Sequence, residues 1–231
     1  MRMNRAFILL LPLLVTGCLH TVKYKLTEAD RWNGPKIDAV LLVQPITDKT
    51  TYTTNDWKPK TVEGETWRTN PRGGYSHTNL TKDVTAMVAK HLAYSGLFSK
   101  VVTDKTAVGD YVLSGKLTAF KTSAQVNSKA ETIAGVSSAF GLIGAVVGST
   151  ATAQMKAEVK TWVTLDELRV NDKSGQIRWQ ESIHIAKDET MNFREADSFV
   201  LYKHPDAALK EAVTDLIRRL GTSSLTNRVA L

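Results

Sequence analysis

The chain has 231 residues, 42% of them hydrophobic, and its formal net charge is +7. This length predicts one domain, or one domain with a large insertion, and the hydrophobic share is enough for a core. A basic balance is common among nucleic-acid-binding proteins. The N-terminus argues against that class, because it has the features of an export signal and an exported protein meets little nucleic acid.

The first segment contains the parts of a secretory signal. Arg2 and Arg5 provide positive charge, and the ten-residue apolar core that follows is too short to span a bilayer, which needs about 20 residues. The segment ends in Val-Thr-Gly-Cys, at Gly17 and Cys18, which resembles a bacterial lipobox. The resemblance implies removal of a lipoprotein signal peptide, residues 1–17. It also implies diacylglycerol on the Cys18 sulfur and an N-acyl chain such as palmitate.

Cys18 is the only cysteine, so the exported chain can form no internal disulfide. A thioether would remove an exposed free thiol, and two or three acyl chains would anchor the protein stably. The alternative is an ordinary signal peptide with a chance cysteine. In bacterial lipoproteins an Asp after the cysteine is the usual signal for inner-membrane retention. This chain has Leu19, so the resemblance implies the periplasmic face of the outer membrane.

The charge of the mature chain leaves two interpretations open. Loss of Arg2 and Arg5 with the signal lowers the net charge from +7 to +5. The remaining surplus could bind an envelope polyanion, such as lipopolysaccharide, phospholipid headgroups or peptidoglycan, or could only favour solubility.

Four parts are expected in the chain, and the signal peptide over 1–17 is the first of them. Residues 18–36 lack a clear period and are interpreted as the lipidated N-terminus and a tether, followed by a domain over 37–221 and a flexible tail over 222–231. Residues 37–43 form an almost continuous apolar run, which predicts a buried strand. Residues 46–77 hold almost no aliphatic side chains and are expected to be a long polar loop.

Apolar periodicity predicts the remaining elements. Apolar side chains recur every four residues over 79–94, which predicts an amphipathic helix, and 205–220 has a second apolar stripe. A strand is expected over 111–119, with Tyr, Leu, Leu and Ala on one face. Alternation over 157–165 and 177–185, around a turn-forming segment, predicts a β-hairpin. The expected fold is α+β, a small mixed or antiparallel sheet with two helices packed on one face.

Four segments carry a family resemblance. AVLLVQPITDKT, HLAYSGLFSKVV, GDYVLSGKLTAF and VTLDELRVNDKSGQIRWQES are similar to segments of outer-membrane lipoproteins built on the fold of the TolB amino-terminal domain. That group includes the lipoprotein activator of a bifunctional penicillin-binding protein and the curli secretion-channel lipoprotein. The resemblance covers 37–44 and 79–220, interrupted at 125–155. It implies a fold rather than an activity.

The interruption, 125–155, is a Gly/Ala/Ser-rich insertion in which residues 132–155 carry no charge. Gly144 and Gly148 form a G-x-x-x-G pattern, and Gly141 lies on the same ridge if the segment is helical. One interpretation is a membrane-spanning or membrane-dipping helix, and another is a pair of strands that joins a barrel of several copies. The third is a small-residue segment that packs on its own domain or at a self-association surface.

The predicted polar loop holds basic residues interleaved with aromatic ones. Trp57, Trp67, Arg68 and Arg72 are of the types that anchor interfaces, and aromatic rings stack on sugars. The loop is therefore a candidate binding site for a protein or a glycan. The alternative is a solvated loop whose tryptophans lie back on the sheet.

The sequence lacks the patterns of common catalytic and metal sites. The five histidines are scattered, no H-E-x-x-H or G-x-S-x-G occurs, and no metal or cofactor is predicted. His91 is expected at the edge of a helix core, and His184 on the solvent face of a strand.

The function expected from the sequence is that of a non-enzymatic adaptor or assembly factor, anchored by lipid and bound to an envelope protein or to copies of itself. Two alternatives remain. The protein could be an oligomeric secretion or transport component whose 132–155 segment enters the membrane, or an auxiliary lipoprotein of a lipid transporter.

Overall fold

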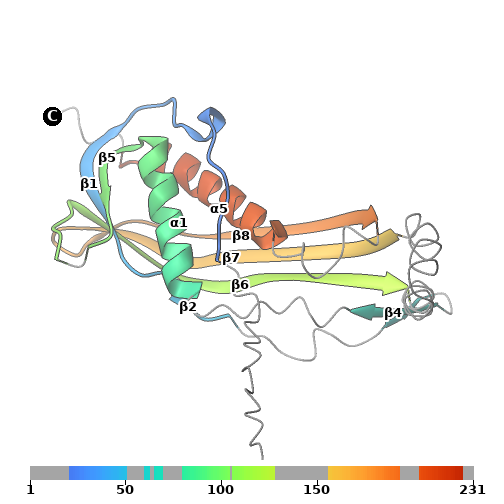
Figure 1. The fold of residues 1–231 in the computed structure, drawn as a ribbon. Coiled ribbons are helices and arrows are strands. Elements are labelled where there is room, and N and C mark those ends of the chain that lie inside the picture. Colours follow the sequence, from blue (N-terminus) through green and yellow to red (C-terminus); the bar gives the residue numbers. More distant parts are fainter. Residues whose placement is uncertain are drawn as a thin grey trace, which may run out of the picture.

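The computed structural model describes the residue ranges 21–50, 60–62, 65–69, 80–104, 106–127, 156–192 and 203–225. Within these ranges the chain forms a mixed sheet of eight strands with two long helices on the same side of it (Figure 1). The predicted α+β class is confirmed. The Gly/Ala/Ser-rich insertion lies outside the described residues beyond Asn127.

The first part of the sheet is a parallel strand–helix–strand unit. β1 (Ile37–Val43) precedes helix α1 (Leu80–Ser95) in the chain. β5 (Phe98–Val102) follows the helix and pairs with β1 in parallel. The predicted strand and helix are confirmed within one residue. β5 was not expected, because its two middle side chains, Ser99 and Lys100, are exposed and hide the strand in the sequence.

Three long antiparallel strands form the second part, β6 (Tyr111–Asn127), β7 (Lys156–Asp172) and β8 (Ile177–Asn192). β7 and β8 are the predicted hairpin, and both run further than expected. Their turn is held by Asp172, whose Oδ1 accepts the Ser174 N–H at 2.9 Å, and by Gly175 at φ 80°. Figure 1 shows the three strands running far beyond the parallel unit.

The other edge of β6 is shared by three short partners. β1 pairs with its start, β2 (Thr47–Asp48) with its middle and β4 (Glu65–Thr69) with its end. β4 in turn pairs with β3 (Lys60–Val62) as a small hairpin. The prediction of an irregular loop over 46–77 was therefore wrong for β2, β3 and β4. Their short sequences show no apolar periodicity, but the backbones of β2 and β4 pair with the edge of β6.

Two bulges keep apolar side chains of the long strands under the helices. Leu117 pairs with Leu165 but Ala119 with Thr164, so β6 holds one extra residue there. Phe120, rather than Ala119 as expected, therefore points into the core, and its side chain is fully buried. A second bulge in β7, at Glu167 with φ 46°, shifts the inward positions of that strand as well.

Helix α5 (Lys203–Gly221) packs mainly on β7 and β8, and its predicted apolar stripe is confirmed. The core between helices and sheet includes the following fully buried side chains: Leu41, Leu92, Leu113, Leu117, Phe120, Leu165, Leu168, Leu209 and Leu216. In the part of the chain that the structure describes, no helix has the length and apolar character needed to cross a bilayer.

Both ends of the predicted domain were placed wrongly. Val22, expected in a tether, has 2% of its surface exposed and belongs to the core, and Leu225, expected in the flexible tail, is equally buried. The short 3-10 helix η1 (Glu28–Asp30) lies between Val22 and β1. The folded domain therefore includes residue 22 and the first residues after α5.

Candidate functional site

The N-terminal strap, defined here as residues 22–32, crosses the two helices. Val22 is buried and Tyr24 half-buried, whereas Lys23 and Lys25 are exposed, so the strap alternates like a strand. The Lys23 N–H donates to Asp206 Oδ2, in the first turn of α5, at 3.2 Å. The inward side chains hold the strap on the helices, and the outward lysines remain in solvent.

The C-terminal end of the strap is fixed by both the backbone and the side chain of Trp32. The Trp32 N–H donates to the Ser95 carbonyl, at the end of α1, at 3.0 Å. A Cβ built on Gly34 or on Gly221 would come within 2.4 Å of the Trp32 ring, so the ring packs directly on both glycines. The strap therefore runs from the start of α5 to the common C-terminal end of both helices.

A buried polar cluster under the strap links it to both helices. Asp30 Oδ2 accepts from Lys210 Nζ at 2.8 Å and from the Thr27 N–H at 2.6 Å. His91 Nδ1 lies 3.3 Å from the Tyr24 hydroxyl, and its Nε2 lies 3.9 Å from Asp30 Oδ1. One carboxylate thus connects the strap to α5, and one phenol connects it to α1.

Burial controls the charges of this cluster. Burial lowers the pKa of His91 to about 4, against the attraction of Asp30, so the imidazole is neutral at pH 7. Burial also works to raise the pKa of the Asp30 carboxyl, but the hydrogen bonds from Lys210 and Thr27 outweigh it and hold that pKa below its usual value. Burial raises the pKa of the Tyr24 hydroxyl. The cluster therefore contains one ion pair, Asp30 with Lys210, beside neutral His91 and Tyr24. These contacts hold the strap on both helices.

A shallow groove of about 470 Å³ lies beside the cluster, along the outer face of α5. It is lined by acidic and basic side chains in similar number: Asp30, Lys210, Glu211, Asp215 and Arg218, with Ala207 and Thr214. The groove therefore presents both signs of charge, from three carboxylates and two cationic side chains.

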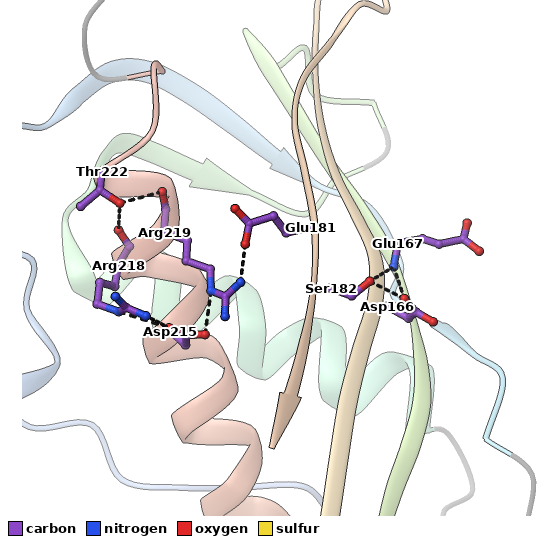
Figure 2. Close-up of polar contacts among 8 residues, drawn as sticks. All are labelled: Asp166, Glu167, Glu181, Ser182, Asp215, Arg218, Arg219 and Thr222. Atoms are coloured by element: carbon purple, nitrogen blue, oxygen red, sulfur yellow. Dashed lines mark hydrogen bonds and ion pairs between the residues drawn. The ribbon is translucent and has the colours of Figure 1, made fainter. Parts of the chain in front are cut away.

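Figure 2 shows how the C-terminal half of α5 is tied to β8. Arg219 Nη1 donates to Glu181 of β8, and Arg219 Nε donates to Asp215 Oδ2, one turn earlier on the helix, at 2.8 Å. The hydrogen bond to Glu181 raises the pKa of the Arg219 guanidinium. Asp215 also accepts from Arg218, which completes a network between the helix and the sheet.

On the other side of β8, Figure 2 shows a second polar group at the β7 bulge. Ser182 Oγ donates to Asp166 Oδ1, which also accepts the Glu167 N–H at 2.9 Å. The hydrogen bond from Ser182 holds the pKa of the Asp166 carboxyl below its usual value. Glu167 pairs with Lys116 of β6 at 2.5 Å. Asp166 thus accepts from both the serine and the bulge, and these contacts support a strained turn of backbone.

Most of the predicted site residues lie outside the described part of the chain. These are Gly17, Cys18, Trp57, Arg72, Gly141, Gly144 and Gly148. Trp67 and Arg68 fall in β4, where their backbones pair with Asn127 and Val126 of β6. Of the predicted site residues, the structure therefore describes only Trp67 and Arg68, which are neighbours in β4.

The solvent-facing position predicted for His184 is confirmed, whereas His91, expected at the edge of a helix core, lies inside the core. His91 is fully buried between helix and strap, and His184 is exposed on β8, 3.3 Å from Thr164 Oγ1. Sequence reasoning missed the strap and its partners Asp30 and Lys210. The available signal was the alternation of Val22, Tyr24 and Leu26 with the two lysines, a period of two. Among the residues that the structure describes, no group of three or more side chains has the arrangement of a metal site.

Comparison with known proteins gives structural similarity alone. No protein-family model matches the chain, and no curated protein matches it. A Xanthomonas campestris protein of the family DUF330 aligns at 13% identity over 85% of this chain and 89% of its own, with a TM-score of 0.45. The PelC dodecamer from Paraburkholderia phytofirmans aligns at 14% identity over 78% and 93%, with a TM-score of 0.33.

A third structure, a homolog of the neuraminyllactose-binding hemagglutinin from Helicobacter pylori, aligns at 7% identity over 86% of this chain and 92% of its own, with a TM-score of 0.38. At these identities and scores the alignments describe a similar arrangement of elements and carry no argument about activity or assembly. The resemblance to the TolB amino-terminal domain remains a prediction.

Proposed function

We propose that the protein is a non-enzymatic adaptor or assembly factor of the bacterial envelope, held at the outer membrane by acyl chains on Cys18. The observation that supports the proposal is the strap, because it changes how far a lipid anchor would let the domain move. The chain is packed on the domain from Val22 onward. At most three residues therefore separate Cys18 from the folded part.

The short connection sets the range of the anchor. An extended chain spans at most about 3.6 Å per residue, so the step from Cys18 to Val22 covers at most about 14 Å. A free tether over 18–36 would reach roughly 65 Å on the same scale. The packed strap thus keeps the domain beside the bilayer, and partners that it binds are membrane-associated.

Tethering of this kind acts through effective concentration. Fixing two binding modules to one surface turns their encounter into an almost intramolecular event and raises the apparent affinity without any new contact. The domain itself needs no catalytic group for this role. Its helices, sheet and strap provide a rigid body whose orientation follows from the place where the anchor leaves it.

Lipidation is tested by the mass of the protein purified from envelopes. The expected product begins at Cys18 and carries diacylglycerol and an N-acyl chain, and Cys18→Ala should move the protein from the membrane fraction to the soluble fraction. A bare thiol on the envelope-bound protein would reject the anchor. Circular dichroism of the Cys18→Ala protein is the control for folding.

The adaptor role is tested by lengthening the connection. A flexible Gly/Ser linker of 15 residues inserted after Leu19 leaves the anchor and the strap intact but lets the domain leave the membrane surface. In-cell crosslinking of wild type should yield a defined heterologous partner, and the linker should weaken that crosslink. A detergent-extracted ring of fixed stoichiometry, with no partner, would instead favour an oligomeric secretion component.

A further inference from the structure

Three lysines lie where the chain enters the domain. Lys23 and Lys25 are the outward residues of the strap, and both are exposed. Lys203 is exposed at the first position of α5, one turn before Asp206, whose carboxylate accepts the Lys23 N–H at 3.2 Å. These three residues, named here the lysine surface, therefore belong to one end of the molecule.

The lysine surface differs from two lysines that contact or belong to α5, Lys187 of β8 and Lys210 of α5, because both of these form ion pairs. Lys187 pairs with Glu211, and Lys210 pairs with Asp30 at 2.8 Å. Within the described ranges, no carboxylate forms an ion pair with Lys23, Lys25 or Lys203. Their ammonium groups therefore form no close ion pair within these ranges and are available to an external anion.

We propose that the lysine surface rests on anionic phospholipid headgroups and so orients the domain on the membrane. The inference depends on the proposed anchor, because Cys18 lies four positions before Val22 and five before Lys23. Its acyl chains would hold this end within roughly 14 Å of the bilayer. That distance is an upper limit, and the anchor also allows the lysines to come within the Debye length of about 8 Å, where the field of an anionic surface acts on them.

The expected strength follows from the number of lysines. A lysine close to an anionic surface contributes about 1 kcal/mol, which corresponds to roughly fivefold in partition coefficient. Three lysines together should therefore change the partition coefficient by roughly 100-fold. The attraction should weaken as salt is added, because it is an exposed electrostatic effect.

The test uses the mature chain, residues 18–231, with Cys18→Ser so that acyl chains do not mask headgroup binding. Sedimentation with vesicles of phosphatidylethanolamine and phosphatidylglycerol, against vesicles of phosphatidylethanolamine and phosphatidylcholine, measures the anionic contribution. The variant K23Q/K25Q/K203Q is compared with K36Q/K100Q/K156Q, which removes the same charge from exposed lysines elsewhere.

The first variant should lose roughly 100-fold in partitioning to the anionic vesicles, and the matched control only a few-fold. Equal losses in both variants, or no preference of wild type for anionic vesicles, would overturn the proposal. Release by inorganic phosphate beyond that by sodium chloride of equal ionic strength would assign the lysines to a free anion instead and would equally overturn it. The mass of Cys18 in envelopes is measured separately, so failure of the anchor and failure of the lysine surface are distinguishable.

Discussion

The two faces of the long strands β6, β7 and β8 are stabilised in different ways. On the face under the helices, fully buried apolar side chains such as Phe120 and Leu165 pack together. The opposite face has partly exposed polar contacts, such as the ion pair of Lys116 with Glu167 and the cation–π contact of Lys121 with the Trp162 ring at 5.2 Å. Burial of one large apolar side chain contributes about 1.5–3 kcal/mol, whereas an exposed ion pair contributes about 0–1 kcal/mol.

This difference teaches that the helix-covered face determines whether the domain folds, and the other face mainly determines its local shape. The strap is part of the helix-covered side of the domain, because Val22 and the Asp30 cluster are buried against the helices. Only the outward side of the strap is polar. Changes at matched positions on the two faces test the comparison directly.

The largest effect is expected at adjacent residues of β6 that point to opposite faces. Phe120→Ala should lower the free energy of unfolding by about 3–5 kcal/mol, because it leaves a cavity among buried side chains. Lys121→Ala should lower it by about 1 kcal/mol or less, since its cation–π contact with Trp162 is only partly buried. Urea denaturation of both variants provides the measurement, and equal losses would contradict the division between the faces.

The strap should make the helix-covered face sensitive to acid. The pKa of His91 is about 4 in the folded protein and 6.5 in the unfolded chain, so the unfolded state binds more protons between these values. The free energy of unfolding should therefore fall as pH falls from 7 to 5, by about 2 kcal/mol from this residue. Urea titrations at the two pH values measure the change.

The matched control for this pH effect is the exposed histidine of β8. His91→Gln should remove most of the decrease between pH 7 and 5, whereas His184→Gln should leave it unchanged. A decrease that persists in His91→Gln would assign the acid sensitivity to carboxylates, whose pKa values lie in a lower range.

A smaller loss is expected when the strap loses its link to α5. Asp30→Ala removes the acceptor of Lys210 and Thr27 and should destabilise the protein by about 1–2 kcal/mol, because these hydrogen bonds are largely buried. Glu28→Ala, two residues earlier and exposed, should change stability by less than about 0.5 kcal/mol. Hydrogen exchange at residues 22–32 should rise in Asp30→Ala alone, and unchanged exchange would show that Asp30 does not hold the strap.

The smallest effect concerns the bulge on the opposite face. Glu167→Ala and Glu167→Gly both remove the ion pair with Lys116, but only glycine accepts φ 46° without steric cost. The glycine variant should therefore be more stable than the alanine variant by about 1 kcal/mol. Thermal unfolding of the two variants side by side gives the difference, and a more stable alanine variant would mean that the backbone at residue 167 is not strained.

Sequence patterns predicted the elements whose side chains show one clear period. α1, α5 and the β7–β8 hairpin were recognised because their apolar residues recur at the spacing of the element itself. β5 was missed because Ser99 and Lys100 are exposed in its centre. The short strands β3 and β4 were missed for a different reason, since their place in the sheet depends on backbone pairing that side-chain periodicity does not report.

The candidate site divides in the same way. Cys18 is predicted from a local motif alone. The order of the predicted signal, strands and helices along the chain also depends only on local patterns. The strap was interpreted as a tether because its five alternating residues include two lysines, and the partners that bury it, His91 and Lys210, are distant in the sequence.

The amino-acid sequence by itself determined the helices and the long hairpin, and it predicts a signal with a lipobox-like end, because each depends on residues that are neighbours in the chain. Only the tertiary structure decided that the strap covers both helices, that bulges redirect Phe120 inward and that short strands complete the β6 edge. These features depend on contacts between distant segments, whose energies no local pattern contains.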